Sequence, residues 1–222
     1  MVDTFPARAG AQRDQPGRHT VEGLAACSIL RVGEAMKDLL RRLKQATPRF
    51  LSWMQALHRT HAEASRSVSQ VASPRLRDYW PREHLDSSRV VIVDEIPFPP
   101  VSEYGLPEFE SMAAMSMAGI TFGDMYFLKR EHAIESVHTH ELVHVIQWGE
   151  LGPEEFLLTY ALGIAQHGYR QSPFESAAYE VQREFDAGRA VPDLLDSVRA
   201  HARKQRDGAE GVFRDHGLVM SV

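Results

Sequence analysis

The chain has 222 residues, with 30 acidic and 25 basic side chains and a formal net charge of −5. Hydrophobic residues make up 43% and charged residues 25%, which argues against a collagen-like, coiled-coil or fully disordered chain. This length fits one domain, with or without a helical extension. The single cysteine, Cys27, argues against an internal disulfide framework and a multi-cysteine zinc site.

The distribution of apolar and charged residues bears on location and partners. No stretch approaches 18 uninterrupted apolar residues, so we expect no membrane span. The first residues lack the apolar core of an export signal, so we expect a cytoplasmic protein. Residues 1–72 carry a net charge of +5 and residues 73–222 a net charge of −10. The basic cluster of Lys37, Arg41, Arg42 and Lys44 raises the possibility of nucleic-acid binding, but it lies in no known recognition motif and the chain is acidic, so we expect no nucleic-acid partner.

The first part of the chain predicts helices. Residues 1–20 show little apolar periodicity and predict a disordered tail, followed by an N-terminal helical region over residues 21–88. Apolar residues at helical spacing predict one helix from Gly33 to Gln45. Thr47 and Pro48 then fit an N-cap and first helical position, so we expect a second helix to start there. Residues 73–88 have no clear period and predict a connector.

The second part predicts a mainly helical α+β domain over residues 89–206, with a C-terminal tail over residues 207–222. The β-branched run Val90–Val93 predicts a buried strand. Ile120–Leu128 predicts another strand, in which Gly123 and Asp124 fit either a tight turn or a bulge. Four helices are expected after it: Ser136 to about Glu150, Pro153 to about His167, Ser172–Pro173 to Gly188, and Pro192 to about Arg206.

The first of these four helices contains the motif H-E-x-x-H, formed by His140, Glu141 and His144. Residues i and i+4 share one face of a helix, so both histidines can reach one metal ion. Glu141 lies about 100° further round the helix and cannot be an ordinary third ligand. It is placed instead to act as a base toward a water molecule that the metal activates.

A catalytic zinc ion usually has three protein ligands, so a third ligand is needed. The extended pattern H-E-x-x-H-x-x-G-x-x-H fails, because Gln147 and Glu150 stand at its last two defined positions. Glu175 lies 31 residues beyond His144, on a helix that has room to return beside the first. The same residue also completes the capping box Ser172-x-x-Glu175, which needs no metal. Both interpretations remain open. Glu154 and Glu155 follow the motif too soon, at the start of the next helix, so the other candidates are His167 and Glu180.

The runs H-E-L-V-H-V-I-Q and S-P-F-E-S-A-A-Y resemble the zincin metallopeptidases of the gluzincin type. They are similar in particular to small bacterial zincin-like domains with H-E-L-x-H-V-x-Q and a later N-P-x-E-x-x-A-Y. The resemblance implies that His140, His144 and Glu175 bind Zn²⁺ and that Glu141 is the general base. It also implies a small sheet whose edge strand borders the active-site helix, a role for which Ile120–Leu128 is the candidate.

Two tyrosines complete the candidate site, because Tyr169 and Tyr179 could donate a hydrogen bond to an oxyanion, although packing also explains them. We therefore expect a zinc-dependent hydrolase, a metallopeptidase that acts on a peptide or protein substrate. The alternative is a non-catalytic interaction module that uses zinc structurally or not at all. The substrate, the oligomeric state and the role of the N-terminal helices stay open.

Overall fold

The computed structural model describes the backbone of residues 19–220 and the side chains of residues 33–220. The chain divides into two compact units, Met1–Met36 and Lys37–Val222. Residues 37–88 and residues 89–206, which the sequence analysis separated, lie in the same unit. The expected disordered tail, residues 1–20, lies outside the described residues except for its last two, which begin the first helix.

The described part of the chain is mainly helical and carries one small sheet, so the predicted α+β class is confirmed. The strands are β1 (Arg66–Ser67), β2 (Arg89–Val93), β3 (Gly119–Phe122) and β4 (Met125–Lys129). The α-helices are α1 (His19–His61), α2 (Val68–Val71), α3 (Pro74–Tyr79), α4 (Arg82–Ser87), α5 (Glu110–Ala113), α6 (Glu135–His167), α7 (Pro173–Asp186) and α8 (Leu194–Asp215), and the 3-10 helices are η1 (Pro107–Phe109) and η2 (Arg130–His132).

The sheet has the strand order β1-β2-β4-β3. β2 and β4 are parallel, with Val91 opposite Phe127, and the other two pairs are antiparallel. The predicted strand Ile120–Leu128 is therefore two strands, β3 and β4, joined by the tight turn at Gly123-Asp124. Gly123 has a φ of +67°, which suits a hairpin turn. Only the β3 half of the predicted segment is an edge strand.

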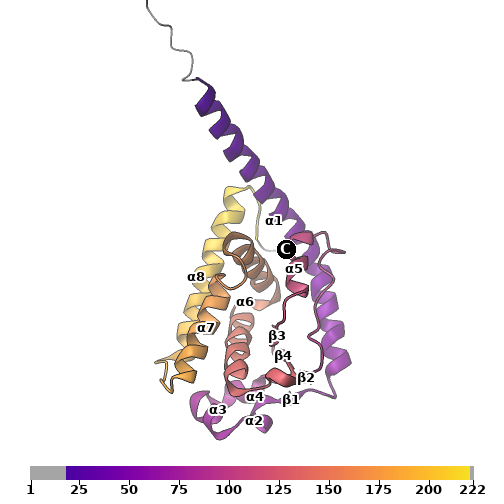
Figure 1. Ribbon diagram of the computed structural model, residues 1–222, viewed down its shortest axis with the longest axis vertical. Helices are drawn as coiled ribbons and strands as arrows, with labels where there is room; N and C mark the ends of the chain where they lie inside the picture. Colours follow the sequence, from indigo (N-terminus) through magenta and orange to yellow (C-terminus); the bar gives the residue numbers. More distant parts are fainter. Residues whose placement is uncertain (1–18, 221–222) are drawn as a thin grey trace, which may run out of the picture. The chain divides into compact units, whose positions relative to one another are not determined.

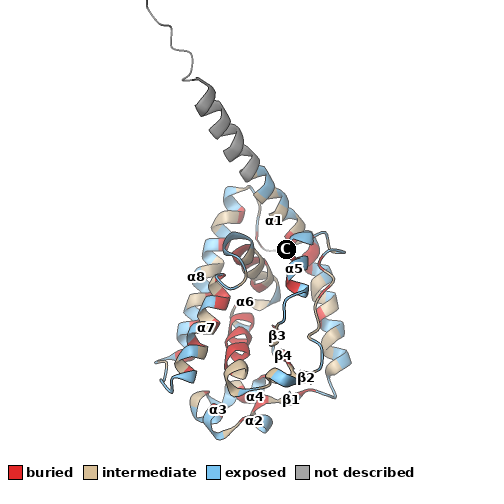
Figure 2. Cartoon of the chain, viewed as in Figure 1, coloured by how far each residue is buried: buried red, intermediate tan, exposed pale blue. Residues whose placement is uncertain are grey.

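Helix α6 lies between the sheet on one side and α7 and α8 on the other (Figure 1). Residues 139–148 are buried at every position (Figure 2), because neighbours cover this part of the helix all round. Gly152, with φ 73° and ψ 165°, breaks the helix, and Pro153 starts its second half. The predicted separation into two helices at Gly152-Pro153 is thus confirmed as a sharp break.

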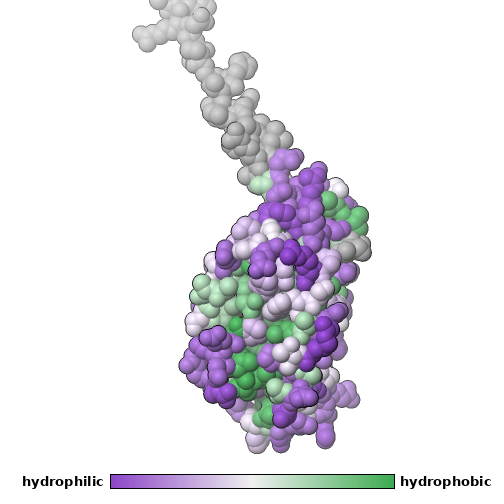
Figure 3. Space-filling view, turned by 90° about the vertical axis from the view of Figure 1, so that its right-hand side faces the viewer, coloured by the Kyte–Doolittle hydropathy of each residue, from purple (hydrophilic) through white to green (hydrophobic). Residues whose placement is uncertain are grey.

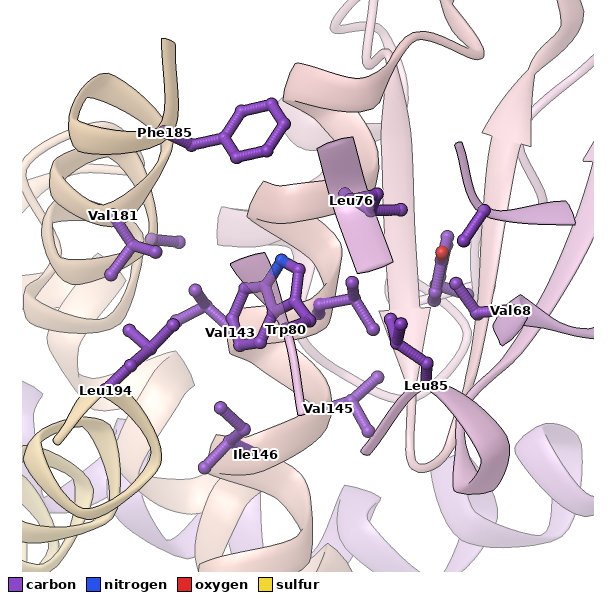
Figure 4. Close-up of a cluster of buried hydrophobic side chains, with 14 of the residues drawn as sticks. Val68, Leu76, Trp80, Leu85, Val143, Val145, Ile146, Val181, Phe185 and Leu194 are labelled. Atoms are coloured by element: carbon purple, nitrogen blue, oxygen red, sulfur yellow. The ribbon is translucent and has the colours of Figure 1, made fainter. Parts of the chain in front are cut away.

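Two groups of buried apolar side chains hold α6 in place. In the first, side chains of α6 such as Val143 and Ile146 meet those of α2, α3, α4, α7 and α8 (Figure 4). In the second, Trp148 and Phe156 of α6 meet Phe127 of β4 and Met54 of α1. The helix that carries the H-E-x-x-H motif is therefore fixed by packing along its length, which rigidifies any site built on it.

The predicted break between two N-terminal helices is wrong, because α1 continues through Thr47 and Pro48. Thr47 does not cap a helix; its Oγ1 donates to the carbonyl oxygen of Leu43 at 2.9 Å. Proline removes one backbone donor, but Leu43 before it and Met54 after it are both buried. Burial of this apolar face offsets the loss of one hydrogen bond.

The expectations for residues 73–88 and 207–222 are also corrected. Residues 73–88 are not a plain connector, because they form α3 and α4, too short to show a period, with Leu76 and Leu85 fully buried. The predicted C-terminal tail continues α8 to Asp215, and Phe213 is fully buried. Beyond the helix, Lys44 Nζ donates to the carbonyl oxygen of Val219 at 2.6 Å.

Candidate metal centre

The two histidines of the H-E-x-x-H motif face each other on α6. Their Nε2 atoms lie 3.1 Å apart, as the i, i+4 spacing predicts. His140 and His144 are each only 6% exposed. Tyr179 of α7 packs on the His140 ring, with ring centroids 4.5 Å apart.

Glu175 of α7 completes this group from a neighbouring helix. Its Oε2 lies 3.3 Å from His140 Nε2, and its Oε1 lies 3.3 Å from His144 Nε2. Burial alone would raise the pKa of Glu175, but the two histidines outweigh this effect and hold the pKa well below its usual range. The same carboxylate raises the pKa of His144 to about 9 against the lowering effect of burial. The buried carboxylate of Glu175 therefore stays ionised and favours positive charge beside it.

The alternative interpretation of Glu175 as half of a capping box is not supported. Ser172 is the N-cap residue of α7, but its side chain makes no capping hydrogen bond. Within the described residues, the buried Oγ of Ser172 has no hydrogen-bond partner at all. The carboxylate of Glu175 contacts the two histidines instead.

The side chain of Gln182 fixes the protonation of His140. The Oε1 atom of Gln182 lies 3.1 Å from His140 Nδ1, and its Nε2 donates to Ser136 Oγ at 2.8 Å. Ser136 in turn donates to Asp186 Oδ2 at 2.8 Å. Since a carboxylate only accepts, each donor along this chain is defined, and His140 must donate through Nδ1. In the neutral ring that a metal requires, Nε2 then carries the lone pair.

Gln147 determines in the same way which ring nitrogen of His144 donates a hydrogen bond. Its Oε1 lies 2.8 Å from His144 Nδ1, and its Nε2 donates to the carbonyl oxygen of Phe174 at 3.3 Å. A carbonyl oxygen cannot donate, so the amide orientation of Gln147 is fixed and His144 also donates through Nδ1. A histidine that binds a metal must first lose its Nε2 proton, and in that form both histidines direct an Nε2 lone pair toward the same point. Without a metal, the raised pKa of His144 keeps a proton on its Nε2, which faces Glu175.

These groups together fit a divalent cation. The Nε2 atoms of His140 and His144 converge with the carboxylate of Glu175, and one ligand atom from each of the three residues lies within 4.8 Å of the other two. Among the described residues, Glu175 Oε2 has no hydrogen-bond donor. An unpaired buried acceptor is costly, and a cation bound by the three residues would satisfy this one. Two histidines and one glutamate form a ligand set typical of catalytic zinc, which leaves a position open.

Glu141 lies on a different face of α6, beside the edge strand. Thr121 of β3 donates from Oγ1 to Glu141 Oε2 at 2.7 Å. A Cβ atom at Gly119 of β3 would stand 2.6 Å from Glu141 Oε1, so only glycine leaves room for the carboxylate there. Burial raises the pKa of Glu141, while His140, His144 and the Thr121 hydrogen bond oppose this effect.

Three tyrosines surround Glu175. Tyr160 donates to Glu175 Oε1 at 2.6 Å. Burial and then the charge of Glu175 raise the pKa values of Tyr169 and Tyr179, so both phenols stay protonated and able to donate. Arg170 lies over the Tyr179 ring, 5.6 Å from its centroid.

The structure separates the remaining candidates from this group. His167 and Glu180 are exposed and lie outside the cluster that could hold a metal ion. Sequence reasoning missed the roles of Gln147, Gln182, Tyr160, Thr121 and Gly119. Only Gln147 carried a local signal, because it is a polar residue inside an apolar stretch, three positions after His144.

Two members of the basic cluster on α1, Arg42 and Lys44, contact other parts of the protein. Arg42 forms an ion pair with Glu108 and donates to the carbonyl oxygen of Gly105 at 2.8 Å.

Within residues 19–220, none of the helices combines the length and the apolar character that spanning a bilayer requires. A comparison of the chain with protein-family models, with curated proteins and with solved structures finds no match.

Proposed function

We propose that His140, His144 and Glu175 bind one zinc ion and that the protein is a zinc-dependent hydrolase. The observation that carries this proposal is the convergence of two histidine Nε2 atoms and a carboxylate, each group oriented by a further hydrogen bond. The burial of Glu175 supports it, because its Oε2 has no hydrogen-bond partner among the described residues and a bound cation would satisfy it. Zinc in such a site polarises a carbonyl group and lowers the pKa of a water molecule toward 7.

Glu141 is the proposed general base. It sits next to the ligand histidines but outside their pair, and Thr121 fixes one of its two carboxylate oxygens. Burial raises its pKa, which makes it a stronger base at neutral pH. In the proposed reaction Glu141 takes a proton from the attacking water and passes it to the leaving group.

A peptide is the substrate that the surroundings favour. The edge strand β3 borders Glu141 through both Gly119 and Thr121. An extended peptide can add to the edge of a sheet through main-chain hydrogen bonds, which would bring its carbonyl group to the base. Tyr169 and Tyr179 keep their protons, so either could donate to an oxyanion.

The test measures zinc and hydrolysis separately. Protein prepared without a histidine tag should contain about one zinc ion per chain by elemental analysis. The double variant His140→Ala/His144→Ala should lose that zinc, because both nitrogen ligands are gone. Retention of zinc by the double variant would contradict the assigned ligands.

A second variant separates catalysis from binding. Glu141→Gln should keep the zinc but lose hydrolysis of a fluorogenic peptide library, since the amide is near in shape but is not a base. Joint loss of zinc and activity would make Glu141 a ligand or a structural residue. Stoichiometric zinc without any turnover by the parent protein would favour the alternative, an interaction module with structural zinc.

A further inference from the structure

An apolar pocket of about 130 Å³ opens directly beside the candidate metal centre. Glu141, His144 and Glu175 form part of its lining. Apolar residues also reach the surface on the face shown in Figure 3. The pocket differs from an ordinary apolar surface patch because the candidate metal ligands His144 and Glu175 line it. A molecule held by the metal centre would therefore extend into an apolar space.

Part of the pocket wall also comes from segments outside the H-E-x-x-H helix. Helix α1 contributes Leu43 and Phe50, and the segment between β2 and β3 contributes Phe109 and Met112. The edge strand contributes Ile120. A peptide that lies along β3 would thus pass the pocket mouth, because the strand borders both the pocket and Glu141.

Charge is confined to the catalytic end. Among the lining residues that the structure describes, the acidic or basic side chains are Glu141, His144 and Glu175. A charged group placed elsewhere in the pocket would find no oppositely charged side chain among these lining residues, and burying an unpaired charge is costly. An apolar side chain would instead gain free energy by leaving water.

We propose that this pocket binds the side chain of a large apolar residue next to the scissile bond, and that α1 helps to set this preference. The inference rests on the proposed peptidase function. It also gives the N-terminal helix a role, because residues 43–50 of α1 form one wall of the pocket.

Polar contacts hold that wall against the segment that faces it. Arg49 Nη1 donates to the carbonyl oxygen of Glu103 at 2.7 Å. Arg42 bonds to the carbonyl oxygen of Gly105 and to the carboxylate of Glu108. These contacts join α1 to the loop that carries Leu106 and Phe109, both of which line the pocket. The size of the pocket is therefore determined by α1 as well as by α6.

The test fills the pocket from two different helices. Ala161 of α6 lines the pocket and is half-buried, whereas Ala165 on the same helix is exposed. Ala46 of α1 lines the pocket, whereas Ala56 on the same helix is exposed. The variants Ala161→Phe and Ala46→Leu are therefore matched by the controls Ala165→Phe and Ala56→Leu.

The parent should cleave peptides with Phe, Leu or Met at one side of the scissile bond about 10- to 100-fold better, by kcat/KM, than peptides with Ala there. Lys and Asp should be cleaved no better than Ala. Both filling variants should lose this preference and both controls should keep it. Circular dichroism checks that each variant is folded. If Ala161→Phe on α6 does not fold, Ala46→Leu on α1 tests the same prediction.

A binding assay keeps the inference separate from the proposed reaction. Zinc-loaded Glu141→Gln should bind a fluorescent peptide containing Phe at least about 10-fold tighter than the same peptide with Ala, and Ala161→Phe should remove that difference. Turnover without any side-chain preference would contradict the proposed role of the pocket but not the peptidase function. Preferential binding without turnover by the parent would contradict the peptidase function but not the role of the pocket. Equal or no binding of the two peptides would contradict the role of the pocket.

Discussion

Two glutamine amides decide which nitrogen of each histidine faces the proposed metal ion. Gln182 reaches from α7 to His140 on α6, and Gln147 reaches from α6 to the backbone of α7 while it accepts from His144. The two bridges run in opposite directions between the same helices. They therefore fix both the histidine rings and the position of the helix that carries Glu175.

Removing either amide should weaken zinc binding. We expect Gln147→Leu and Gln182→Leu to lower zinc affinity about 10- to 100-fold, because the histidine Nδ1 donor loses its acceptor. Gln182→Glu keeps an acceptor oxygen and should keep the affinity near that of the parent. Competition with a chromogenic chelator measures the affinity, with Gln166→Leu at an exposed position of α6 as control. Parent-like affinity in both leucine variants would show that these bridges do not support the site.

Single substitutions at Glu175 and Ser172 distinguish the two interpretations of Glu175, as a metal ligand and as part of a capping box. Glu175→Gln should sharply weaken zinc binding, since it removes an anionic ligand, while helix content by circular dichroism stays the same. Ser172→Ala should change the free energy of unfolding by less than about 0.5 kcal/mol, because the hydroxyl makes no cap. A loss of about 1 kcal/mol in Ser172→Ala with unchanged zinc binding in Glu175→Gln would instead restore the capping box.

At the scale of elements, the break in α6 positions the site. Gly152 adopts φ 73° and ψ 165°, a conformation that essentially only glycine adopts. The break lets the second half of α6 change direction, and that half carries Tyr160, which donates to Glu175. The geometry around the third ligand thus depends on one backbone position.

Gly152→Ala should destabilise the protein by about 1 to 3 kcal/mol, measured by urea unfolding. The matched control is Gly149→Ala, three residues earlier on the same helix. An added Cβ meets nothing within 4 Å at either position, so sterics are equal and only the backbone conformation differs. Gly149 lies in regular helix, and alanine there should stabilise by about 0.5 to 1 kcal/mol. Equal effects at both positions would contradict a strained break at Gly152.

At the scale of the whole molecule, buried histidines make stability depend on pH. His84 joins α4 to α6 by donating from Nε2 to the carbonyl oxygen of Leu142 at 3.0 Å. Burial lowers the pKa of His84 to about 4 from its ordinary 6.5, while this hydrogen bond opposes the shift. The folded protein therefore keeps His84 neutral at pH values where the unfolded chain takes up a proton.

The sign of the effect follows from linkage. The stability from neutral His84 is fully present above pH 6.5 and is lost as the pH falls from 6.5 toward 4, by at most about 3 kcal/mol. His84→Gln carries no titrating group, so its free energy of unfolding should fall less over that range. Urea unfolding with a chelator present at each pH keeps metal release out of the comparison. Parallel curves for parent and variant would show that His84 does not contribute.

The local sequence was enough to predict the features that depend on neighbouring residues. The strand Val90–Val93, the helix break at Gly152-Pro153 and the common face of His140 and His144 follow from periodicities and turn chemistry within a few positions. Backbone hydrogen bonds in a helix or hairpin join residues that are close in the chain, so such features are visible in the sequence. The same local reasoning failed at Thr47-Pro48, where burial of the apolar face of α1 outweighed the loss of the backbone hydrogen bond at the proline.

Tertiary structure alone decided the rest of the site. Ser172-x-x-Glu175 is equally consistent with a cap and with a ligand, and only the packing of α7 against α6 directs Glu175 toward the histidines. Gln182 lies 42 positions from His140, and the space for Glu141 exists because β3 presents a glycine. Such contacts depend on how distant elements pack together, which no periodicity within one element encodes. The H-E-x-x-H motif was therefore readable from the sequence. Its third partner was indicated there only by the family resemblance, and its supporting hydrogen bonds were not indicated at all.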